Sequence, residues 1–149
     1  MRAVIQRVNK AKVVINNTES REISRGIVIF VAITHTDTEK DAKWLSDKCV
    51  NLRIFPKDNN ENKFDKSVLD IKGDILVISQ FTLYGDCNKG RRPDFINSAK
   101  PEYAELLYES FIKFLKEYGL NIITGKFKTH MDVELHNDGP VTLIIDTKS

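Results

Sequence analysis

The sequence has little that would tie it to a metal, a disulfide framework or a membrane. Its 149 residues include only two cysteines, Cys49 and Cys87, and three histidines. Two cysteines do not make a disulfide framework, and these cysteines and histidines have no metal-ligand spacing. The longest apolar run, residues 27–33, is far too short to span a membrane. These features favour a reducing, cytoplasmic setting with no metal, no cofactor framework and no membrane contact.

A strong net charge is also absent. The formal net charge is only +2, whereas a nucleic-acid-binding domain is normally more basic and clusters its Lys and Arg residues. The bulk charge therefore does not indicate such a domain, although it leaves room for a local basic patch. A chain of this length buries enough apolar surface to fold without cross-links. Its length is that of a single domain. We take residues 1–149 as a single domain.

Apolar periodicity predicts strands towards both ends of the chain and helices between them. A capping box, with Thr36 as N-cap and Glu39 three residues later, opens a first helix. Pro101 suits the first turn of a second helix, which Gly119 ends. The sequence thus predicts one α/β domain with a β-rich, sheet- or barrel-like core and two main helices packed on one side. The expected strands are 3–5, 13–15, 27–33, 75–78, 131–135 and a buried one at 141–145, with turns at 9–10 and 137–140 and a polar loop at 57–63.

A group of polar residues follows the expected strand at 75–78. Ser79, Gln80 and Thr82 arrive together after four apolar residues. Because buried polar groups need hydrogen-bond partners, these side chains either cap the strand end or bond the next strand. The alternative is a group of donors at the rim of a pocket, suited to a carbonyl or an oxyanion. Thr82 as a nucleophile would need an adjacent base, and no His or Lys lies near it in the sequence.

Two further features have a plain and a functional interpretation. The basic run Lys89-Gly90-Arg91-Arg92 is typical of a solvated face, but its place beside the polar group also allows contact with a phosphate backbone. Lys126 and Lys128 would extend that surface. Cys87 paired with a histidine is the remaining nucleophile–base arrangement, and it would make the protein a thiol-dependent hydrolase.

Two motifs together resemble those of the D-aminoacyl-tRNA deacylases. Ser79-Gln80-Phe81-Thr82 resembles the Ser-Gln-x-Thr motif of that family, and residues 137–142, Asn-Asp-Gly-Pro-Val-Thr, look like its Gly-Pro motif. The stretches MRAVIQRV, NLRIF, KGRRPDF and NDGPVTLIID fall in the family's order and spacing. Either motif alone is weak evidence, whereas both at matching length, in a resemblance that covers the whole chain, are specific.

The resemblance implies a homodimeric hydrolase of the ester between a D-amino acid and tRNA, with no metal or cofactor. Family members also act on glycyl-tRNA, including glycine mischarged on the alanine tRNA. Their Gly-Pro bond is cis, and the motif of one subunit reaches into the active site of the other. The implied catalytic residues are Ser79, Gln80, Phe81 and Thr82. The implied substrate-binding residues are Arg7, which holds the Gly-Pro motif in place, with Met131, Asn137, Gly139, Pro140, Val141 and Thr142.

The implied mechanism is a chiral filter made of backbone. With the α-amino group and the ester fixed, an L side chain would strike the backbone of Gly139 and Pro140, whereas a D side chain points to open space and glycine has nothing to clash. Main-chain donors near Phe81 and Thr82 would hold the ester carbonyl, and a ribose hydroxyl of the terminal adenosine would assist the attack. The alternative of another class is a non-catalytic tRNA-end binding module with the same fold. The chain departs from the family at residues 128–130, Lys-Thr-His, where small residues are usual, which bears on how the adenosine is held.

Overall fold

The long first strand organises the molecule. In the computed structural model, which describes residues 1–58 and 60–148, β1 (Arg2–Ile15) pairs along its length with β8 (Met131–Asp146). On its other side β1 pairs first with β3 (Gly26–Ala32) and then with β2 (Glu19–Ile23), both antiparallel. One strand therefore connects two halves of the sheet that face different parts of the core.

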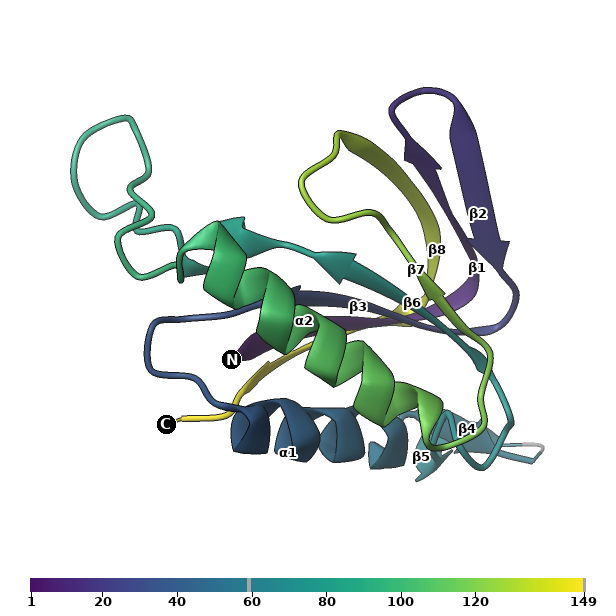
Figure 1. The fold of residues 1–149 in the computed structure, drawn as a ribbon. Helices are drawn as coiled ribbons and strands as arrows, with labels where there is room; N and C mark the ends of the chain where they lie inside the picture. The colour runs from purple at the N-terminus through teal and green to yellow at the C-terminus, as the bar shows by residue number, and fades with distance from the viewer. Residues whose placement is uncertain (59, 149) are drawn as a thin grey trace.

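The sheet continues from β3 through two parallel neighbours. β6 (Asp74–Ser79) pairs with β3, and β7 (Ile122–Thr124) pairs with β6, which completes six strands. In Figure 1 the outer parts of β1 and β8, together with β2, curl over the sheet, so that it approaches a closed barrel. β4 (Phe55–Lys57) and β5 (Asn60–Lys66) form a separate two-stranded sheet.

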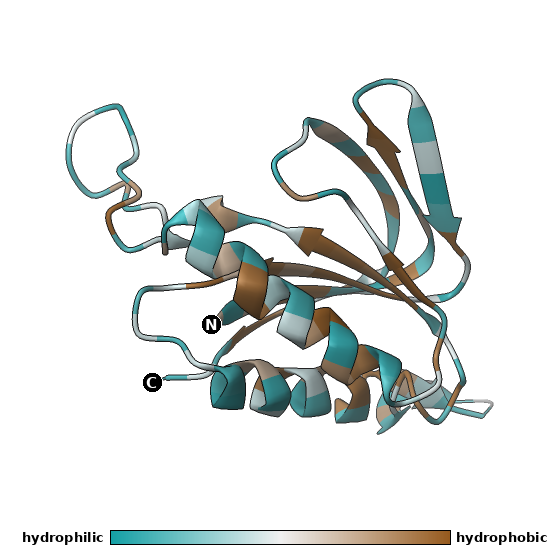
Figure 2. Cartoon of the chain, viewed as in Figure 1, coloured by the Kyte–Doolittle hydropathy of each residue, from teal (hydrophilic) through white to brown (hydrophobic). Residues whose placement is uncertain are grey.

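Two helices cover one face of the sheet. α1 (Glu39–Asn51) and α2 (Pro101–Lys116) lie side by side beneath β3 and β6, and the two chain ends lie close together (Figure 1). The helices turn apolar residues such as Leu45 and Phe111, both fully buried, towards the sheet. Figure 2 shows this division, with brown central strands and helices that are largely teal on their outer side. No helix in the described part of the chain is long and apolar enough to cross a membrane.

The curl of the sheet encloses a second apolar cluster on the face opposite the helices. Val13, Val28 and Leu76, each fully buried, are among its members, and Met131 and Val133 of β8 pack against it. The predicted class, an α/β domain with a barrel-like β core and two helices on one side, is confirmed.

Several predicted boundaries are wrong because strands continue where turn residues stand. Residues 9–10 do not form a turn, since β1 runs through them and changes its partner there from β3 to β2. Residues 137–140 do not form a turn either, because β8 runs through them with irregular pairing opposite Gln6 and Val8. The pairing of the flanking residues, Val8 and Ala11 on β1 and Asn137 and Thr142 on β8, outweighs local turn preference at both places.

Other expectations need smaller corrections. The first helix begins at Glu39 with Thr38 as N-cap, and the carboxylate of Asp41, rather than Glu39, reaches back to the Thr38 N–H at 2.8 Å. The polar stretch 57–63 is mostly the β4–β5 hairpin, and residue 59 within it lies outside the described residues. The strand at 141–145 is not buried throughout, since Val141 is buried but Ile144 is 68% exposed.

Gly26 begins β3 at a point where no side chain fits. A Cβ built there would lie 1.8 Å from the backbone carbonyl oxygen of Asp74 on β6. Since no side-chain rotation relieves a clash with backbone, we expect Gly26→Ala to lower the free energy of unfolding by about 3 kcal/mol, measured by urea denaturation. Gly90→Ala is the control, because its φ of 69° is strained but its Cβ meets no atom, and it should cost only about 1 kcal/mol. Equal losses for the two variants would contradict this account of Gly26.

Candidate active site

A cavity of about 590 Å³ opens at the carboxyl ends of β3 and β6. The two strands are parallel, so their ends meet at one edge of the sheet. The start of α2 forms a second wall, and residues 127–131 with Val133 form a third. The cavity therefore gathers four segments that are far apart in the sequence.

The predicted Ser-Gln-x-Thr stretch lies mostly in this cavity. Ser79, Gln80 and Phe81 line it, and Thr82 does not. The chain turns here because the Gln80 N–H donates to the carbonyl of Val31 at 2.8 Å, after which the 3₁₀ helix η1 (Phe81–Tyr84) begins. The amide of Gln80 donates to the hydroxyl of Thr82 at 2.5 Å, so these two side chains satisfy one another.

The segment before β8 supplies the opposite wall. Met131 lines the cavity, and Lys128, Thr129 and His130, where the sequence departs from the motifs it resembles, line it as well. The departure from that resemblance thus falls at the cavity itself. Lys128 has a φ of 60°, a left-handed conformation that favours glycine. The Met131 side chain packs directly against Gly125, because a Cβ on Gly125 would lie 2.5 Å from the Met131 sulfur.

Residues 95–101 complete the cavity, and this was not predicted from the sequence. The ring of Phe95 lies edge-on to that of Phe81, with centroids 5.1 Å apart. The Ser98 hydroxyl donates to the Phe81 carbonyl at 3.0 Å, and Lys100 stands at the rim. Pro101 marked the helix start correctly, but nothing in the sequence pattern of residues 95–100 indicated that they meet the polar turn.

The predicted Gly-Pro residues form a second cluster around Arg7. The Gly139–Pro140 peptide is cis, and both residues are exposed. Arg7 is only 6% exposed; its Nε donates to the carbonyl of Asp138 at 3.2 Å and lies 3.1 Å from the Asp138 carboxylate. Its Nη1 donates to the carbonyl of Ile54 at 2.6 Å. The cation therefore ties the segment before Gly139 to the segment between α1 and β4.

Local hydrogen bonds fix the remaining members of this cluster. The amide of Asn137 donates to the Thr142 hydroxyl at 2.8 Å and accepts from the Val141 N–H at 3.1 Å. Gln6 on β1 donates to the same Thr142 hydroxyl at 3.1 Å. Asn137 thus joins the two ends of the irregular part of β8 through Val141 and Thr142, and Arg7 binds Asp138 between those ends.

The two clusters do not meet within one chain. Met131 begins β8, and Gly139 comes eight residues later on the same strand, which is a distance of about 26 Å at the usual rise of a strand. Neither Arg7 nor any of residues 137–142 lines the cavity. The structure brings Ser79, Gln80, Phe81 and Met131 together, and it separates them from Arg7, Asn137, Gly139, Pro140, Val141 and Thr142.

The described residues hold no nucleophile–base pair at the cavity. Cys49 is fully buried, and burial raises the pKa of its thiol far above its ordinary value. Cys87 is exposed, and no hydrogen bond joins it to a histidine anywhere in residues 1–58 or 60–148. His130 is 3.6 Å from Asp132 at the exposed rim. Over the same residues, no three His, Cys, Asp or Glu side chains are grouped so as to hold a metal ion.

Known sequences match this chain over its full length. The chain is 51% identical over 149 residues to the D-aminoacyl-tRNA deacylase of Petrotoga mobilis, covering 99% of this chain and 98% of the relative. It is 50% identical over 147 residues to the protein of the same name from Thermotoga petrophila, covering 99% and 97%. The sequence model described as D-Tyr-tRNA(Tyr) deacylase matches residues 4–146.

Solved structures share the fold of this chain. A c-Myc DNA unwinding element binding protein superimposes with a TM-score of 0.92 at 38% identity, with both chains covered completely. A probable eukaryotic D-amino acid tRNA deacylase shares the fold, with a TM-score of 0.83 at 18% identity and 97% of each chain covered. With a family match over nearly all of its length, and with both family motifs at the positions described above, the chain belongs to the D-Tyr-tRNA(Tyr) deacylase family.

Proposed function

We propose that this chain hydrolyses the ester bond of D-aminoacyl-tRNA and releases the free D-amino acid and tRNA. The observation that carries the proposal is the turn Ser79-Gln80-Phe81 at the cavity, in a chain about half identical throughout to proteins named for this activity. The cavity is also of a size that holds a small molecule, such as the aminoacylated end of a tRNA.

The first experiment is the discharge of D-Tyr-tRNA and L-Tyr-tRNA by the purified protein in the presence of a metal chelator. Rapid loss of the D ester alone would support both the hydrolase and the chiral filter. Equal loss of both esters would keep the hydrolase and remove the filter. Binding of both esters without discharge would replace the proposal by the non-catalytic tRNA-end binding module.

The reaction needs little from side chains. Water adds to the ester carbonyl carbon, the bond to the ribose oxygen breaks, and a proton from the water ends on that oxygen. Among the described residues, the backbone N–H groups of Phe81 and Thr82 donate to no acceptor, whereas those of Gln80 and Leu83 do. Phe81 lines the cavity, and the N–H of Thr82 follows it in the same turn. Two such donors stabilise the charge that develops on the carbonyl oxygen. The adjacent ribose hydroxyl of the substrate relays the proton, which requires no basic side chain.

Thr82 is not the nucleophile in this scheme. Its hydroxyl lies outside the cavity lining and accepts from the amide of Gln80, with no His or Lys bonded to it in the described part of the chain. We therefore expect Thr82→Ala to retain D-Tyr-tRNA deacylation within about threefold of the original chain, since a lost nucleophile would cost several powers of ten. Single-turnover assays with circular dichroism as a folding check measure this. Complete loss in a folded variant would restore Thr82 as the nucleophile.

Discrimination between enantiomers comes from the backbone of Gly139 and Pro140. A filter of main-chain atoms rejects an L side chain by clash and is indifferent to the nature of a D side chain. It also passes glycine, so glycyl-tRNA, including glycine mischarged on alanine tRNA, is a second substrate. The exposure of both residues and the anchoring of Asp138 by Arg7 support this role.

The filter acts in trans, in a homodimer. Gly139 and Pro140 lie far from the cavity of their own chain, so a site that contains both needs a second copy. The outward face beside them offers an apolar row, because Val4 pairs with Phe30 on one side and with Ile144 on the other, and Ile144 is 68% exposed. A symmetric dimer would place each Gly-Pro segment at its partner's cavity.

Subunit complementation tests this arrangement. Ser98→Trp fills the cavity, and Gly139→Ala damages the filter. If the site is shared, mixing the two inactive variants under subunit exchange restores roughly one quarter of the active sites, because one site of each hybrid dimer combines two intact halves. If both halves come from one chain, no hybrid contains an intact site, and the mixture stays inactive.

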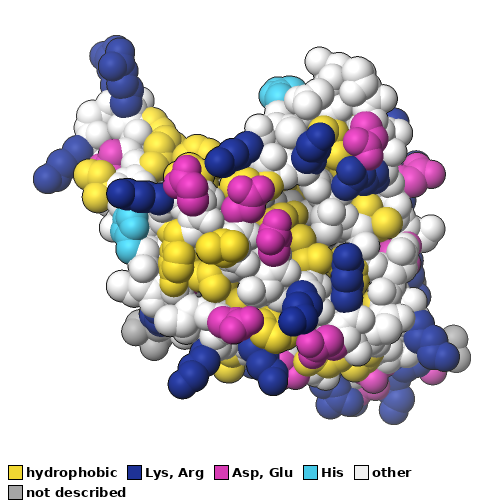
Figure 3. Space-filling view, viewed as in Figure 1, with side chains coloured by type: hydrophobic (Ala, Val, Ile, Leu, Met, Phe, Trp, Pro, Cys, Tyr) yellow, Lys and Arg dark blue, Asp and Glu magenta, His cyan; other side chains and the backbone are white. Residues whose placement is uncertain are grey.

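A basic arm beside the cavity contacts the tRNA backbone. The loop 85–94, closed by paired backbone hydrogen bonds between Asp86 and Asp94 at 2.8 and 3.0 Å, projects from the body (Figure 1). Figure 3 shows dark blue side chains on this projection. Its exposed basic residues are Lys89, Arg91 and Arg92, and Lys100 and Lys128 continue the charge to the cavity rim. Such residues bind phosphates and position an RNA without reading its sequence.

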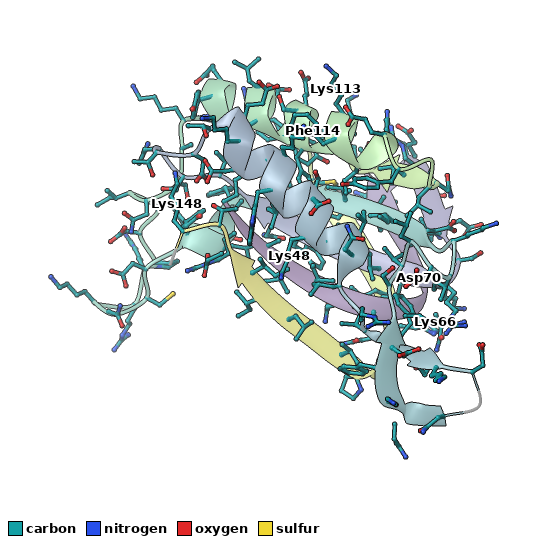
Figure 4. The ribbon with its side chains drawn as sticks, turned by 90° about the horizontal axis from the view of Figure 1, so that it is seen from below. Lys48, Lys66, Asp70, Lys113, Phe114 and Lys148 are labelled. Carbon is teal, nitrogen blue, oxygen red and sulfur yellow. The ribbon has the colours of Figure 1, made fainter. Side chains whose placement is uncertain are left out.

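The arm should therefore affect binding and leave chemistry unchanged. We expect the triple change of Lys89, Arg91 and Arg92 to Ala to raise KM for D-Tyr-tRNA about tenfold at low salt and to flatten its salt dependence, with kcat unchanged. The control removes three charges from the helices at Lys48, Lys113 and Lys116, the first two of which are labelled in Figure 4. An equal rise in KM for both triple variants would mean that only net charge matters.

A further inference from the structure

The guanidinium of Arg7 is held by three segments that are distant in the sequence. Besides Asp138 and the Ile54 carbonyl, it meets the ring of Phe64 on β5, with Cζ 5.8 Å from the ring centroid. Phe64 lies on β5 of the β4–β5 hairpin. Figure 4 shows this hairpin beside the yellow final part of β8 and labels Lys66, the last residue of β5. The ring thus covers the cation that anchors the Gly-Pro segment.

Phe64 is an unexpected residue for its position. The hairpin is a two-stranded sheet separate from the main sheet, with register irregularities beside Pro56, and such a hairpin has little stability of its own. Phe64 is 53% exposed, so it does not serve chiefly as a core residue. Its ring over the guanidinium is an attraction that strengthens where water is excluded, and Arg7 is 6% exposed.

Arg7 in turn touches the residue that carries the filter. A Cβ added to Gly139 would lie 3.0 Å from Nη2 of Arg7, so the guanidinium packs directly against the Gly139 backbone. A filter that rejects by clash works only when its backbone cannot give way. Whatever holds Arg7 still therefore sets how strictly an L side chain is refused.

We propose that Phe64 is a positioning residue for the Gly139–Pro140 segment and, acting through Arg7, sets the strictness of discrimination between D and L esters. The proposal rests on the proposed function, since it assigns a specificity role within that reaction. Phe64 does not touch the substrate. It limits the movement of Arg7, and Arg7 limits the movement of Asp138 and Gly139. The hairpin thereby becomes part of the specificity apparatus although it lies outside the cavity.

The test compares Phe64→Ala with the original chain on D-Tyr-tRNA and L-Tyr-tRNA. We expect the D ester to be discharged within about threefold of the original rate and the L ester to be discharged about tenfold faster, so that the D-to-L ratio falls about tenfold. Phe64→Tyr keeps the ring and should restore the original ratio. Phe64→Leu keeps apolar volume without the ring's charge distribution, so it should lie between the two, and it provides the test if Phe64→Ala does not fold.

Lys63→Ala is the matched control on the same strand. Its side chain points to the opposite face of β5, so it perturbs the hairpin without uncovering Arg7. An unchanged D-to-L ratio in Phe64→Ala and Phe64→Leu overturns the proposal, and so does an equal loss of both rates, which indicates only a structural role. Failure of the proposed function itself would appear separately, as an original chain that discharges neither ester or both equally.

Discussion

Replacing Gly139 with alanine will lower kcat/KM for D-Tyr-tRNA by about 100-fold, since misplacement of a positioning group by about 1 Å is enough for such a loss. Gly139 has a φ of 122°, which L residues rarely adopt. An added Cβ would lie 2.9 Å from a methyl of Val141 and 3.0 Å from Nη2 of Arg7. The backbone of the proposed filter must therefore shift, and Arg7 must shift with it.

The measurement is single-turnover deacylation with the free energy of unfolding determined in parallel. Gly119→Ala provides the control for backbone strain, because Gly119 has a φ of 74° and its added Cβ would meet no atom within 4 Å. Both variants should lose about 1–3 kcal/mol of stability from the strained conformation. Only Gly139→Ala should lose activity, since Gly119 lies beyond α2 and away from both site clusters.

The thiol-dependent hydrolase makes the opposite prediction at this position. A protein that used Cys87 would be inactivated by thiol alkylation and would tolerate Gly139→Ala in a folded chain. Cys87 is the exposed cysteine, so alkylation of the native protein reaches it before the buried Cys49. Full activity after alkylation, together with loss of activity in Gly139→Ala, would exclude that reaction.

The sequence predicted the fold class because its strongest signals are local. Continuous β-branched runs placed β3 and β6, and Pro101 placed the start of α2 to the residue. It failed at residues 9–10 and 137–140 for a common reason. Local residue types indicate how readily a chain turns, whereas pairing partners far away decide whether it does. β1 is paired on both sides up to Val8 and again from Ala11, and β8 is paired up to Asn137 and again from Thr142, so the flanking pairs keep each strand continuous.

The residues of the candidate site likewise fall into those that the sequence predicted and those that only the tertiary structure reveals. The motif residues 79–81 and Met131 could be named from the sequence, and they do line one cavity. Phe95, Ser98 and Lys100 could not be named, because their role depends on how the loop after η1 returns to the cavity. The position of Phe64 over Arg7 is also a purely tertiary fact, since the two residues meet only when the hairpin folds back beside β8.

A single strand carries both halves of the proposed site. β8 begins with Met131 in the cavity and continues to Gly139 at the Arg7 cluster. In a dimer each copy of β8 would therefore contribute to two sites, lining its own cavity with one end and reaching its partner's with the other. In such a dimer the irregular pairing in the middle of β8 would serve the shared site, because the exposed Gly139 and Pro140 fall in this stretch of an otherwise paired strand.

Arg7 is the residue whose loss should damage both stability and activity. It is 6% exposed and donates to the carbonyls of Ile54 and Asp138 while pairing with the Asp138 carboxylate. Arg7→Ala leaves a buried carbonyl without a donor, a carboxylate without a partner and a void under Phe64. We expect a loss of about 3 kcal/mol in the free energy of unfolding and about 100-fold in kcat/KM for D-Tyr-tRNA.

Two substitutions separate the contributions of charge, hydrogen-bonding geometry and packing made by the Arg7 side chain. Arg7→Lys keeps a positive charge but cannot reach Ile54 and Asp138 together, because an ammonium lacks the planar fork of a guanidinium. It should keep more than half of the stability that Arg7→Ala loses and still lower kcat/KM about tenfold. Arg7→Met keeps the length and apolar packing without any charge, so it should resemble Arg7→Ala in activity. If Arg7→Met retained full activity and an unchanged D-to-L ratio, Arg7 would act only through packing, and the anchoring of the Gly-Pro segment would have to come from the Asn137 bridge to Val141 and Thr142.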